Sequence, residues 1–163
     1  MSSAQVLHVC SSDLKGTPKR AVSSGHMRSD YGLVGDAHAG PGHRQVSLLH
    51  IDDIRFMEAK GLDLEPGAFG ENLVVGGFDL LSLGIGSTLQ VGEAELEITQ
   101  IGKVCHSRCA IYDRTGDCIM PRQGVFARVL QGGDVRPGSP ILVHRRLPRE
   151  TASDLQILAT QES

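Results

Sequence analysis

The sequence predicts a mainly β protein, a small, partly closed β-barrel with one clear helix and short accessory helices. Short apolar runs alternate with turn residues at fairly regular spacing, a pattern typical of small barrels. The chain has 20 glycines and 7 prolines but only 4% aromatic residues, and only one stretch shows clear helical periodicity. At 163 residues the chain is long enough for one proper core. We therefore expect a single domain over residues 1–163, with a core at about 7–143 and a polar C-terminal tail at 147–163.

The first half of the chain contains three predicted strands and one long loop. Residues 5–10 form an apolar run closed by turn residues, and residues 21–22 and 45–49 are shorter strand candidates. Residues 23–44 contain five glycines and three histidines. Because compact domains rarely keep about 20 structureless residues without a purpose, we expect this stretch to be a functional loop.

The clearest helix is predicted at residues 50–60. Ile51, Ile54 and Met57 are spaced three apart and share one face, and acidic residues occupy the first turn, where the helix dipole favours them. Gly61 follows as a stop signal. This helix should pack as a brace on the sheet.

The second half of the chain is predicted to be mostly strands. Residues 73–75 form a short apolar strand. Residues 88–91 and 94–101 are the best hairpin, since apolar and polar side chains alternate on either side of a Gly-Glu turn. Residues 125–130 and 141–144 complete the set, joined through glycine-rich turns.

Composition and charge exclude several classes of partner. The formal net charge of -3 argues against a nucleic acid recognised by bulk charge. No run of 18 apolar residues is present, so we expect no membrane partner. The start of the chain lacks a basic leader with an apolar segment, which predicts a cytoplasmic protein without a signal peptide. In that compartment the four cysteines are expected to be thiols, ligands or catalysts, and Cys10, in an apolar run, a buried small hydrophobe.

The remaining three cysteines lie close together in residues 100–126, among basic side chains. The reactive form of cysteine is the thiolate, and neighbouring positive charge lowers the pKa of the thiol. This stretch is therefore the predicted chemical centre. Its candidate residues are Cys105, Cys109, Cys118, His106, Lys103, Arg108 and Arg122.

Metal binding is the alternative interpretation of the same residues. Cys105, Cys109 and Cys118 with a histidine could complete four zinc ligands, but one close cysteine pair without a second is a weak zinc signal. In the glycine-rich loop, His38 and His43 are either metal ligands or hydrogen-bonded structural groups.

Three further polar residues are candidates for contact with a ligand. Arg44 precedes a predicted strand, where it could grip a phosphate or carboxylate or form a surface salt bridge. Glu71 and Asn72 could orient a ligand, although fixing the loop before residues 73–75 is the simpler role.

Five motifs in this order resemble the MOSC domain, the family named after the C-terminal domain of molybdenum cofactor sulfurases. The resemblance is strongest to its short, stand-alone bacterial members. The motifs are GLVGDAHAG…HRQVSLL (32–49), PGAFGENL (66–73), GSTLQVGEAELEITQIGK (86–103), CHSRCAI (105–111) and VRPGSPI (135–141).

The resemblance implies a strand-rich barrel that handles sulfur or the molybdenum cofactor. In related amidoxime-reducing members a cysteine in a C-x-R-C motif holds molybdenum, and Ser107-Arg108-Cys109 matches its second half. In other stand-alone members the matching cysteine follows a proline, an alignment that favours Cys105. Both cysteines stay candidates for the persulfide carrier, with Cys109 ahead of Cys105.

The predicted function is that of a sulfur carrier or sulfurtransferase, with a cysteine persulfide serving molybdenum cofactor or related metal–sulfur chemistry. The chain has no lysine context for pyridoxal phosphate, so the sulfur would come from a separate pyridoxal-phosphate cysteine desulfurase, and the acceptor from a molybdenum cofactor pathway or molybdoenzyme. The alternative is a non-catalytic molybdopterin- or metal-binding module with Cys109 as ligand. In that case His38, His43, His106 and Cys118 would assist, and the chain alone would not hold the cofactor tightly. In the first case the predicted anion-binding residues are Arg44, Lys103, Arg108, Arg122, His38 and Asn72.

Overall fold

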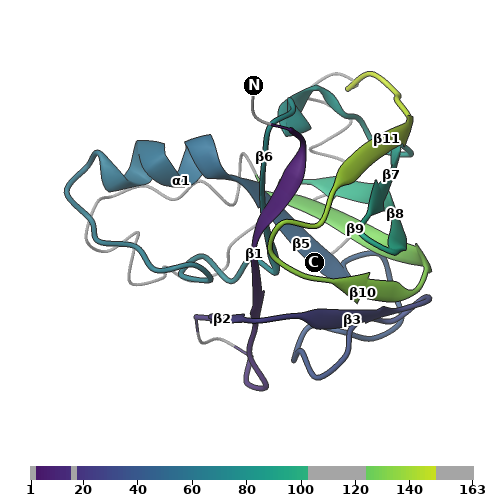
Figure 1. Ribbon diagram of the computed structural model, residues 1–163, viewed down its shortest axis with the longest axis horizontal. Helices are drawn as coiled ribbons and strands as arrows, with labels where there is room; N and C mark the ends of the chain where they lie inside the picture. Colours follow the sequence, from purple (N-terminus) through teal and green to yellow (C-terminus); the bar gives the residue numbers. More distant parts are fainter. Residues whose placement is uncertain (1–2, 16–17, 103–123, 150–163) are drawn as a thin grey trace.

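The computed structural model describes residues 3–15, 18–102 and 124–149, and this part of the chain is mainly β with one α-helix. Eight strands form one sheet in the order β11-β7-β8-β9-β5-β6-β1-β2 (Figure 1). All neighbours are antiparallel except β5 and β6. The bounds are β1 Gln5–Ser11, β2 Arg20–Val22, β5 Val46–His50, β6 Leu73–Gly76, β7 Thr88–Val91, β8 Ala94–Ile101, β9 Val125–Gln131 and β11 Ile141–Arg145.

A smaller sheet corrects the prediction that residues 23–44 form one long loop. β3 Gly25–Arg28 pairs with both β4 Gly32–Leu33 and β10 Gly133–Val135. These strands have two to four residues, and each contributes at most one large buried side chain, such as Met27 or Leu33. Strands this short do not reveal an alternating pattern, which is why the sequence showed only turn residues.

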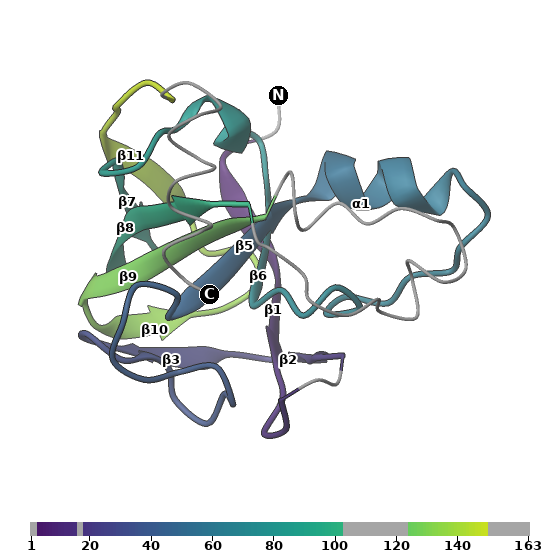
Figure 2. The same cartoon turned by 180° about the vertical axis from the view of Figure 1, so that it is seen from behind.

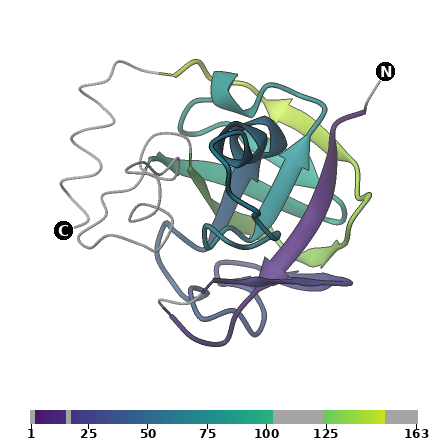
Figure 3. The same cartoon turned by 90° about the vertical axis from the view of Figure 1, so that its left-hand side faces the viewer.

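The end strand β11 approaches β1, the next-to-last strand at the other end of the large sheet, which makes a partly closed barrel, as predicted. The N–H of Val6 in β1 donates to the carbonyl of Ser139 at 2.9 Å, and the N–H of Ile141 in β11 donates to the carbonyl of Ala4 at 3.0 Å. In Figure 3, β1 (purple) and β11 (yellow-green) lie on the same side of the molecule. These few bonds join the start of β1 to the start of β11, but the sheet is not continuously paired around the barrel.

The main core fills the interior of this curved sheet with aliphatic side chains. In β8 the side chains of Ala94, Leu96 and Ile98 are fully buried while those between them are partly exposed, as the two-residue period of a strand requires. Gly92, with φ of +59°, makes the two-residue turn into β8 possible, because II′ hairpin turns need positive φ at this position. The predicted hairpin is thus confirmed at both strands.

The α-helix, α1 Ile51–Glu58, follows β5 directly and projects outward from its end (Figure 2). Ile54 and Met57 are buried and pack in a second apolar cluster with Leu49 and Val74 from β5 and β6. The His50 side chain caps the helix by accepting from the Asp52 N–H at 3.0 Å. The predicted brace is confirmed, and a single turn of 3-10 helix, η1 Leu80–Ser82, follows β6. No helix in residues 3–15, 18–102 and 124–149 is long and apolar enough to cross a membrane.

Candidate functional site

Four strands of the large sheet meet at one edge, and this edge carries a group of buried polar side chains. β5 and β6 are parallel and both begin here, β1 ends here because it is antiparallel to β6, and β2 begins beside it. Residues far apart in the sequence therefore lie together. We call this group the polar cluster, and its members are Cys10, Lys19, Asp36, His38, Ser47, Glu71 and Asn72.

A buried ion pair forms the centre of the polar cluster. The Lys19 Nζ lies 2.7 Å from Asp36 Oδ1, and the two side chains are 1% and 0% exposed. The Ser12 N–H also donates to Asp36 Oδ1, at 3.1 Å, and the His38 N–H donates to Asp36 Oδ2, at 3.2 Å. Burial alone would raise the pKa of Asp36, but the hydrogen bonds from Lys19 and Ser12 lower the pKa below its ordinary value. Asp36 is therefore ionised at neutral pH, with Lys19 as its counterion.

The imidazole of His38 is attached to this ion pair. Lys19 Nζ lies 2.9 Å from His38 Nδ1, so the ammonium donates to both the carboxylate and the ring. Unlike Lys19 and Asp36, His38 is an exposed residue. The ion pair thus holds one edge of a ring that lies at the surface.

Asn72 joins the three strand ends. Its Oδ1 accepts from the Ser47 N–H at 3.0 Å and from the Ser47 hydroxyl at 3.2 Å, and its Nδ2 donates to the Cys10 carbonyl at 3.2 Å. Asn72 is only 1% exposed. These are the contacts of a residue that fixes the loop before β6, and its predicted anion-binding role stays a prediction.

Glu71 holds the turn that covers Lys19. Its carboxylate accepts from the N–H groups of Gly67 at 2.8 Å and Phe69 at 3.0 Å. Gly67 has φ of +91°, and a Cβ there would lie 2.1 Å from the Lys19 carbonyl oxygen, so only glycine fits. Burial raises the pKa of Glu71, although these two N–H groups and Lys19 oppose the shift.

Cys10 lies within the polar cluster but has the character of a structural thiol. It is fully buried, and burial together with the nearby Glu71 carboxylate raises the pKa of its thiol to about 12. At neutral pH the thiol is protonated and therefore a poor nucleophile. The prediction of a buried small hydrophobe is confirmed for Cys10.

The predicted chemical centre lies outside the described residues, but both of its anchors are described. The Gly102 N–H donates to the Gly124 carbonyl at 2.7 Å, so residues 103–123 leave and rejoin the sheet at neighbouring points of β8 and β9. Two residues after Gly124, Phe126 pairs with Ser47, which contacts Asn72. The predicted site residues that lie outside the described part of the chain are Cys105, Cys109, Cys118, His106, Lys103, Arg108 and Arg122.

Arg44 and His43 lie at the same anchor. The Arg44 guanidinium stacks over the Phe126 ring at 5.8 Å from its centroid. The Thr99 hydroxyl of β8 donates to the His43 carbonyl and, at 3.2 Å, to the Phe126 carbonyl. The structure therefore places Arg44 beside the strand that follows the cysteine segment, and His38 in the polar cluster.

The match to a family model decides which family this fold and these motifs represent. The model of the MOSC domain matches residues 34–142, which is more than half of the chain. The chain belongs to the MOSC domain family. This family is associated with molybdenum cofactor sulfurase-like function.

Solved structures share the MOSC fold at low sequence identity. The YUAD protein from Bacillus subtilis has a TM-score of 0.73 and 20% identity, over 90% of this chain and 98% of that one. YiiM from Geobacillus stearothermophilus has a TM-score of 0.71 and 18% identity, over 98% and 86%. YiiM from Escherichia coli has a TM-score of 0.62 and 18% identity, over 96% and 75%. No curated protein matches the chain.

The described part of this MOSC domain does not by itself fit a molybdenum centre. Within residues 3–15, 18–102 and 124–149, no three His, Cys, Asp or Glu side chains are grouped to hold a metal ion. The thiol of Cys10 is buried and protonated, and the charges of Lys19 and Asp36 neutralise each other.

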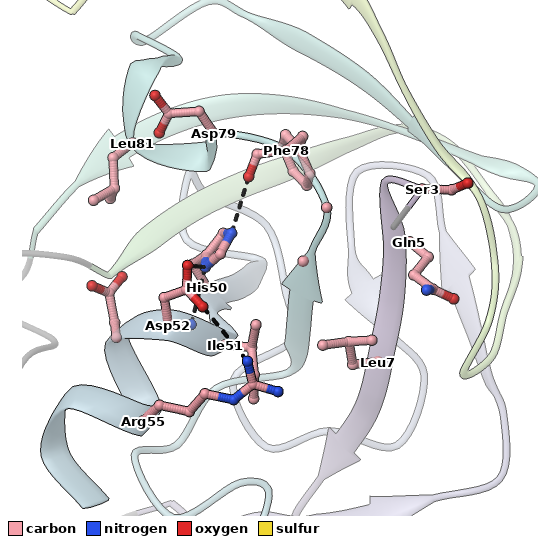
Figure 4. Close-up of a pocket in the computed structure, with 13 residues that line it drawn as sticks. Ser3, Gln5, Leu7, His50, Ile51, Asp52, Arg55, Phe78, Asp79 and Leu81 are labelled. Carbon is pink, nitrogen blue, oxygen red and sulfur yellow. Dashed lines mark hydrogen bonds and ion pairs between the residues drawn. The ribbon is translucent and has the colours of Figure 1, made fainter. Parts of the chain in front are cut away.

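A cavity of about 560 Å³ has no member of the polar cluster in its lining. It opens between the start of α1, the segment after β6 and the start of β1 (Figure 4). Its wall includes His50, whose Nε2–H donates to the Phe78 carbonyl at 3.0 Å, and the Asp52–Arg55 pair. These groups already serve the helix cap, and the cavity adds nothing to the candidate site.

Lys19, Asp36 and Ser47 are members of the polar cluster that the sequence did not predict. Asp36 lies in the Gly35-Asp36-Ala37-His38 motif, so its place beside His38 was the one available signal. Nothing in the sequence separates Lys19 from the exposed Lys15 four residues earlier. Only the tertiary fold buries it.

Proposed function

We propose that this MOSC domain is a sulfur carrier or sulfurtransferase in which a cysteine of residues 103–123 holds a persulfide. The observation that carries the proposal is the position of the polar cluster. Five of its seven members lie in two of the family motifs, 32–49 and 66–73, and it connects through Asn72, Ser47 and Phe126 to the anchor of the cysteine segment. Membership of a family associated with molybdenum cofactor sulfurase-like function supports the same conclusion.

The proposed step is a thiolate–persulfide exchange. The thiolate of Cys109, or of Cys105, attacks the outer sulfur of a persulfide on a donor protein. A new S–S bond forms on this cysteine, the S–S bond of the donor breaks, and the donor cysteine leaves as a thiolate. The sulfane sulfur moves without net oxidation or reduction, so no further electron donor is required.

Positive charge has two tasks in this proposal. Lys103, Arg108 and Arg122 accompany the cysteines in the sequence, and Arg44 lies beside the anchor at Phe126. They would lower the pKa of the attacking thiol and hold an anionic acceptor, such as the phosphate of a pterin cofactor.

A sulfur carrier needs a partner that donates sulfur and a partner that accepts it. We propose that residues 1–163 act as a single domain supplied by a separate pyridoxal-phosphate cysteine desulfurase. The acceptor would be the molybdenum cofactor, or a related metal–sulfur centre, held in a pathway or molybdoenzyme partner.

Mass spectrometry tests the proposal directly. The protein is incubated with a cysteine desulfurase and cysteine, and digested without reduction. We expect a gain of one sulfur on the peptide that contains Cys109 or Cys105, and its loss in Cys109→Ser or Cys105→Ser. Cys10→Ser is the matched control, since that thiol is buried and protonated.

Two outcomes would overturn the proposal. One is sulfur found only on Cys10 or on no cysteine. The other is stoichiometric molybdenum or zinc in the purified protein, lost in Cys109→Ser, with no sulfur uptake. The second result would support the metal-binding alternative.

A further inference from the structure

His50 connects the start of α1 to the segment after β6, and both of its ring nitrogens have a partner. Nδ1 lies 3.0 Å from the Asp52 backbone nitrogen, and Nε2 lies 3.0 Å from the Phe78 carbonyl oxygen (Figure 4). A backbone N–H can only donate, and a carbonyl can only accept. Nδ1 is therefore the acceptor and Nε2 carries the proton, so the ring is neutral in this arrangement.

The hydrogen bond to Nδ1 caps the helix. His50 is the N-cap residue, with extended backbone at φ of -78° and ψ of 140°, and its ring replaces the side-chain oxygen of the residues that usually occupy this position. An oxygen of Ser or Asn stays an acceptor at every pH from about 5 to 8, whereas Nδ1 stops accepting once it is protonated. The cap of α1 therefore depends on the protonation state of one ring.

A carboxylate that could accept from a protonated ring lies beside the same nitrogen. Asp52 Oδ2 is 3.7 Å from His50 Nδ1, and the Asp52 side chain is 74% exposed, so burial does not fix its position. Its other contact is with Arg55 at 3.8 Å, an exposed pair of the kind that contributes little to stability. Asp52 thus offers Nδ1 a donor through its backbone and an acceptor through its side chain.

Further charged groups face His50 from each element that surrounds it. On α1, burial raises the pKa of the Asp53 carboxyl, and the charge of His50 opposes that shift. On the segment after β6, Asp79 lines the same cavity as His50. Arg149, which follows β11, interacts with both Asp53 and Asp79 and offsets part of their charge, and the described lining residues from β1 carry no charge. The helix dipole disfavours an imidazolium at this position, but the carboxylates compensate for it.

We propose that His50 is a pH-sensitive cap, in which Nδ1 exchanges the Asp52 N–H for the Asp52 carboxylate when the ring takes up a proton. In the protonated state Nδ1–H donates to the carboxylate, the Asp52 N–H loses its partner, and the first turn of α1, which lines the cavity, loosens. Nε2–H keeps the Phe78 carbonyl in both states, so the change is confined to the helix start. The exchange uses no residue of the polar cluster and does not depend on whether the chain carries sulfur.

Proton and nitrogen NMR of the ¹⁵N-labelled full chain, titrated from about pH 8 to about pH 5, tests the exchange. At the high end we expect His50 Nδ1 to resonate as an unprotonated nitrogen and Nε2 as a protonated one. As the ring takes up its proton, the Asp52 N–H should lose about 10-fold of its protection against exchange with water, as expected for one hydrogen bond, after correction for the intrinsic effect of pH. The N–H of Met57, in the last turn of α1, should keep its protection.

Three results of this titration would overturn the proposal. The first is a proton on Nδ1 of His50 at the high end of the pH range. The second is an Asp52 N–H whose protection does not follow the protonation of the His50 ring. The third is an equal loss of protection at Met57, which would mean that the whole helix unfolds.

Two variants separate the exchange from other titrations. His50→Asn keeps a side-chain acceptor at the N-cap but takes up no proton, so the Asp52 N–H should show no pH-dependent loss. Asp52→Asn removes the carboxylate and keeps the backbone N–H, which should hold its partner to lower pH than in the wild type. His144→Asn is the control, because His144 contacts Glu95 at 2.9 Å in an exposed pair that joins β11 to β8, and it should behave like the wild type. The wild-type pH dependence in His50→Asn or in Asp52→Asn would show that His50 does not exchange these partners.

Discussion

Breaking the buried Lys19–Asp36 pair should be among the most destabilising single changes at the candidate site. The two charges lie 2.7 Å apart and are 1% and 0% exposed. Removing one partner from such a pair leaves an uncompensated buried charge, at a cost of about 3–5 kcal/mol. We expect Lys19→Met and Asp36→Asn each to lower the free energy of unfolding by that amount. A domain of ordinary stability, about 5–15 kcal/mol, would still fold.

Urea unfolding of Lys19→Met, of Asp36→Asn and of the double variant that carries both changes measures the coupling between the two charges. The double variant has no buried charge, so it should cost less than either single change. Lys15→Met, at an exposed position, should stay within about 0.5 kcal/mol of the wild type. Strictly additive losses, or a loss below about 1 kcal/mol in Lys19→Met, would refute the reasoning.

The pH dependence gives the same experiment a second readout. Although burial raises the pKa of Asp36, the hydrogen bonds from Lys19 and Ser12 lower it below its ordinary value. Its contribution to stability is therefore complete above about pH 4 and is lost as the pH falls through the lower pKa of the folded state. The difference in the free energy of unfolding between the wild type and Asp36→Asn should therefore become smaller below pH 4. A difference independent of pH would show that the carboxylate charge is not involved.

Three further changes test the surroundings of the pair. The pKa of the Cys10 thiol is raised to about 12, so the free energy of unfolding of the wild type in urea should fall as the pH rises above about 9. Cys10→Ala should reduce that fall. The same pH dependence of the free energy of unfolding in both proteins would contradict this expectation. Asn72→Ala leaves buried backbone groups without partners and should cost about 2–4 kcal/mol in urea unfolding, clearly more than Ser47→Ala; equal losses would argue against the bridging role. Gly67→Ala places a Cβ 2.1 Å from a backbone carbonyl, whereas Gly61→Ala, also at positive φ, meets nothing within 4 Å. Gly67→Ala should therefore lower the melting temperature much further, and similar shifts would contradict the close approach.

Local patterns were sufficient to predict most of the large sheet. The hairpin of β7 and β8 has the predicted bounds, because alternation and a glycine turn are both encoded within 14 consecutive residues. The short strands β3 and β10 escaped prediction for the opposite reason. Their pairing joins Asp134 to His26, and no local window contains both partners.

Some residues of the candidate site were predicted from local sequence and others were not. His38, Arg44 and Asn72 were predicted because glycine-rich or strand-flanking contexts draw attention to polar residues. Lys19 was not, because its burial depends on the turn at Gly67, which packs on its backbone from 48 positions further along the chain. Burial and hydrogen bonding of charged groups are tertiary properties, and a single sequence does not report them.

We expect the chain to contain two kinds of thiol. Cys10 shares its environment with Glu71 and with an ammonium that Asp36 already neutralises, so burial dominates and the thiol stays protonated. The cysteines of residues 103–123 instead follow and precede basic residues in the sequence, which favours the thiolate. At pH 7 a thiol reagent should therefore modify one or more of these cysteines in the native protein while Cys10 reacts only after unfolding. Rapid labelling of Cys10 in the native state would mean that the edge where β1, β5 and β6 meet opens readily, and the buried ion pair could not then hold His38 in place.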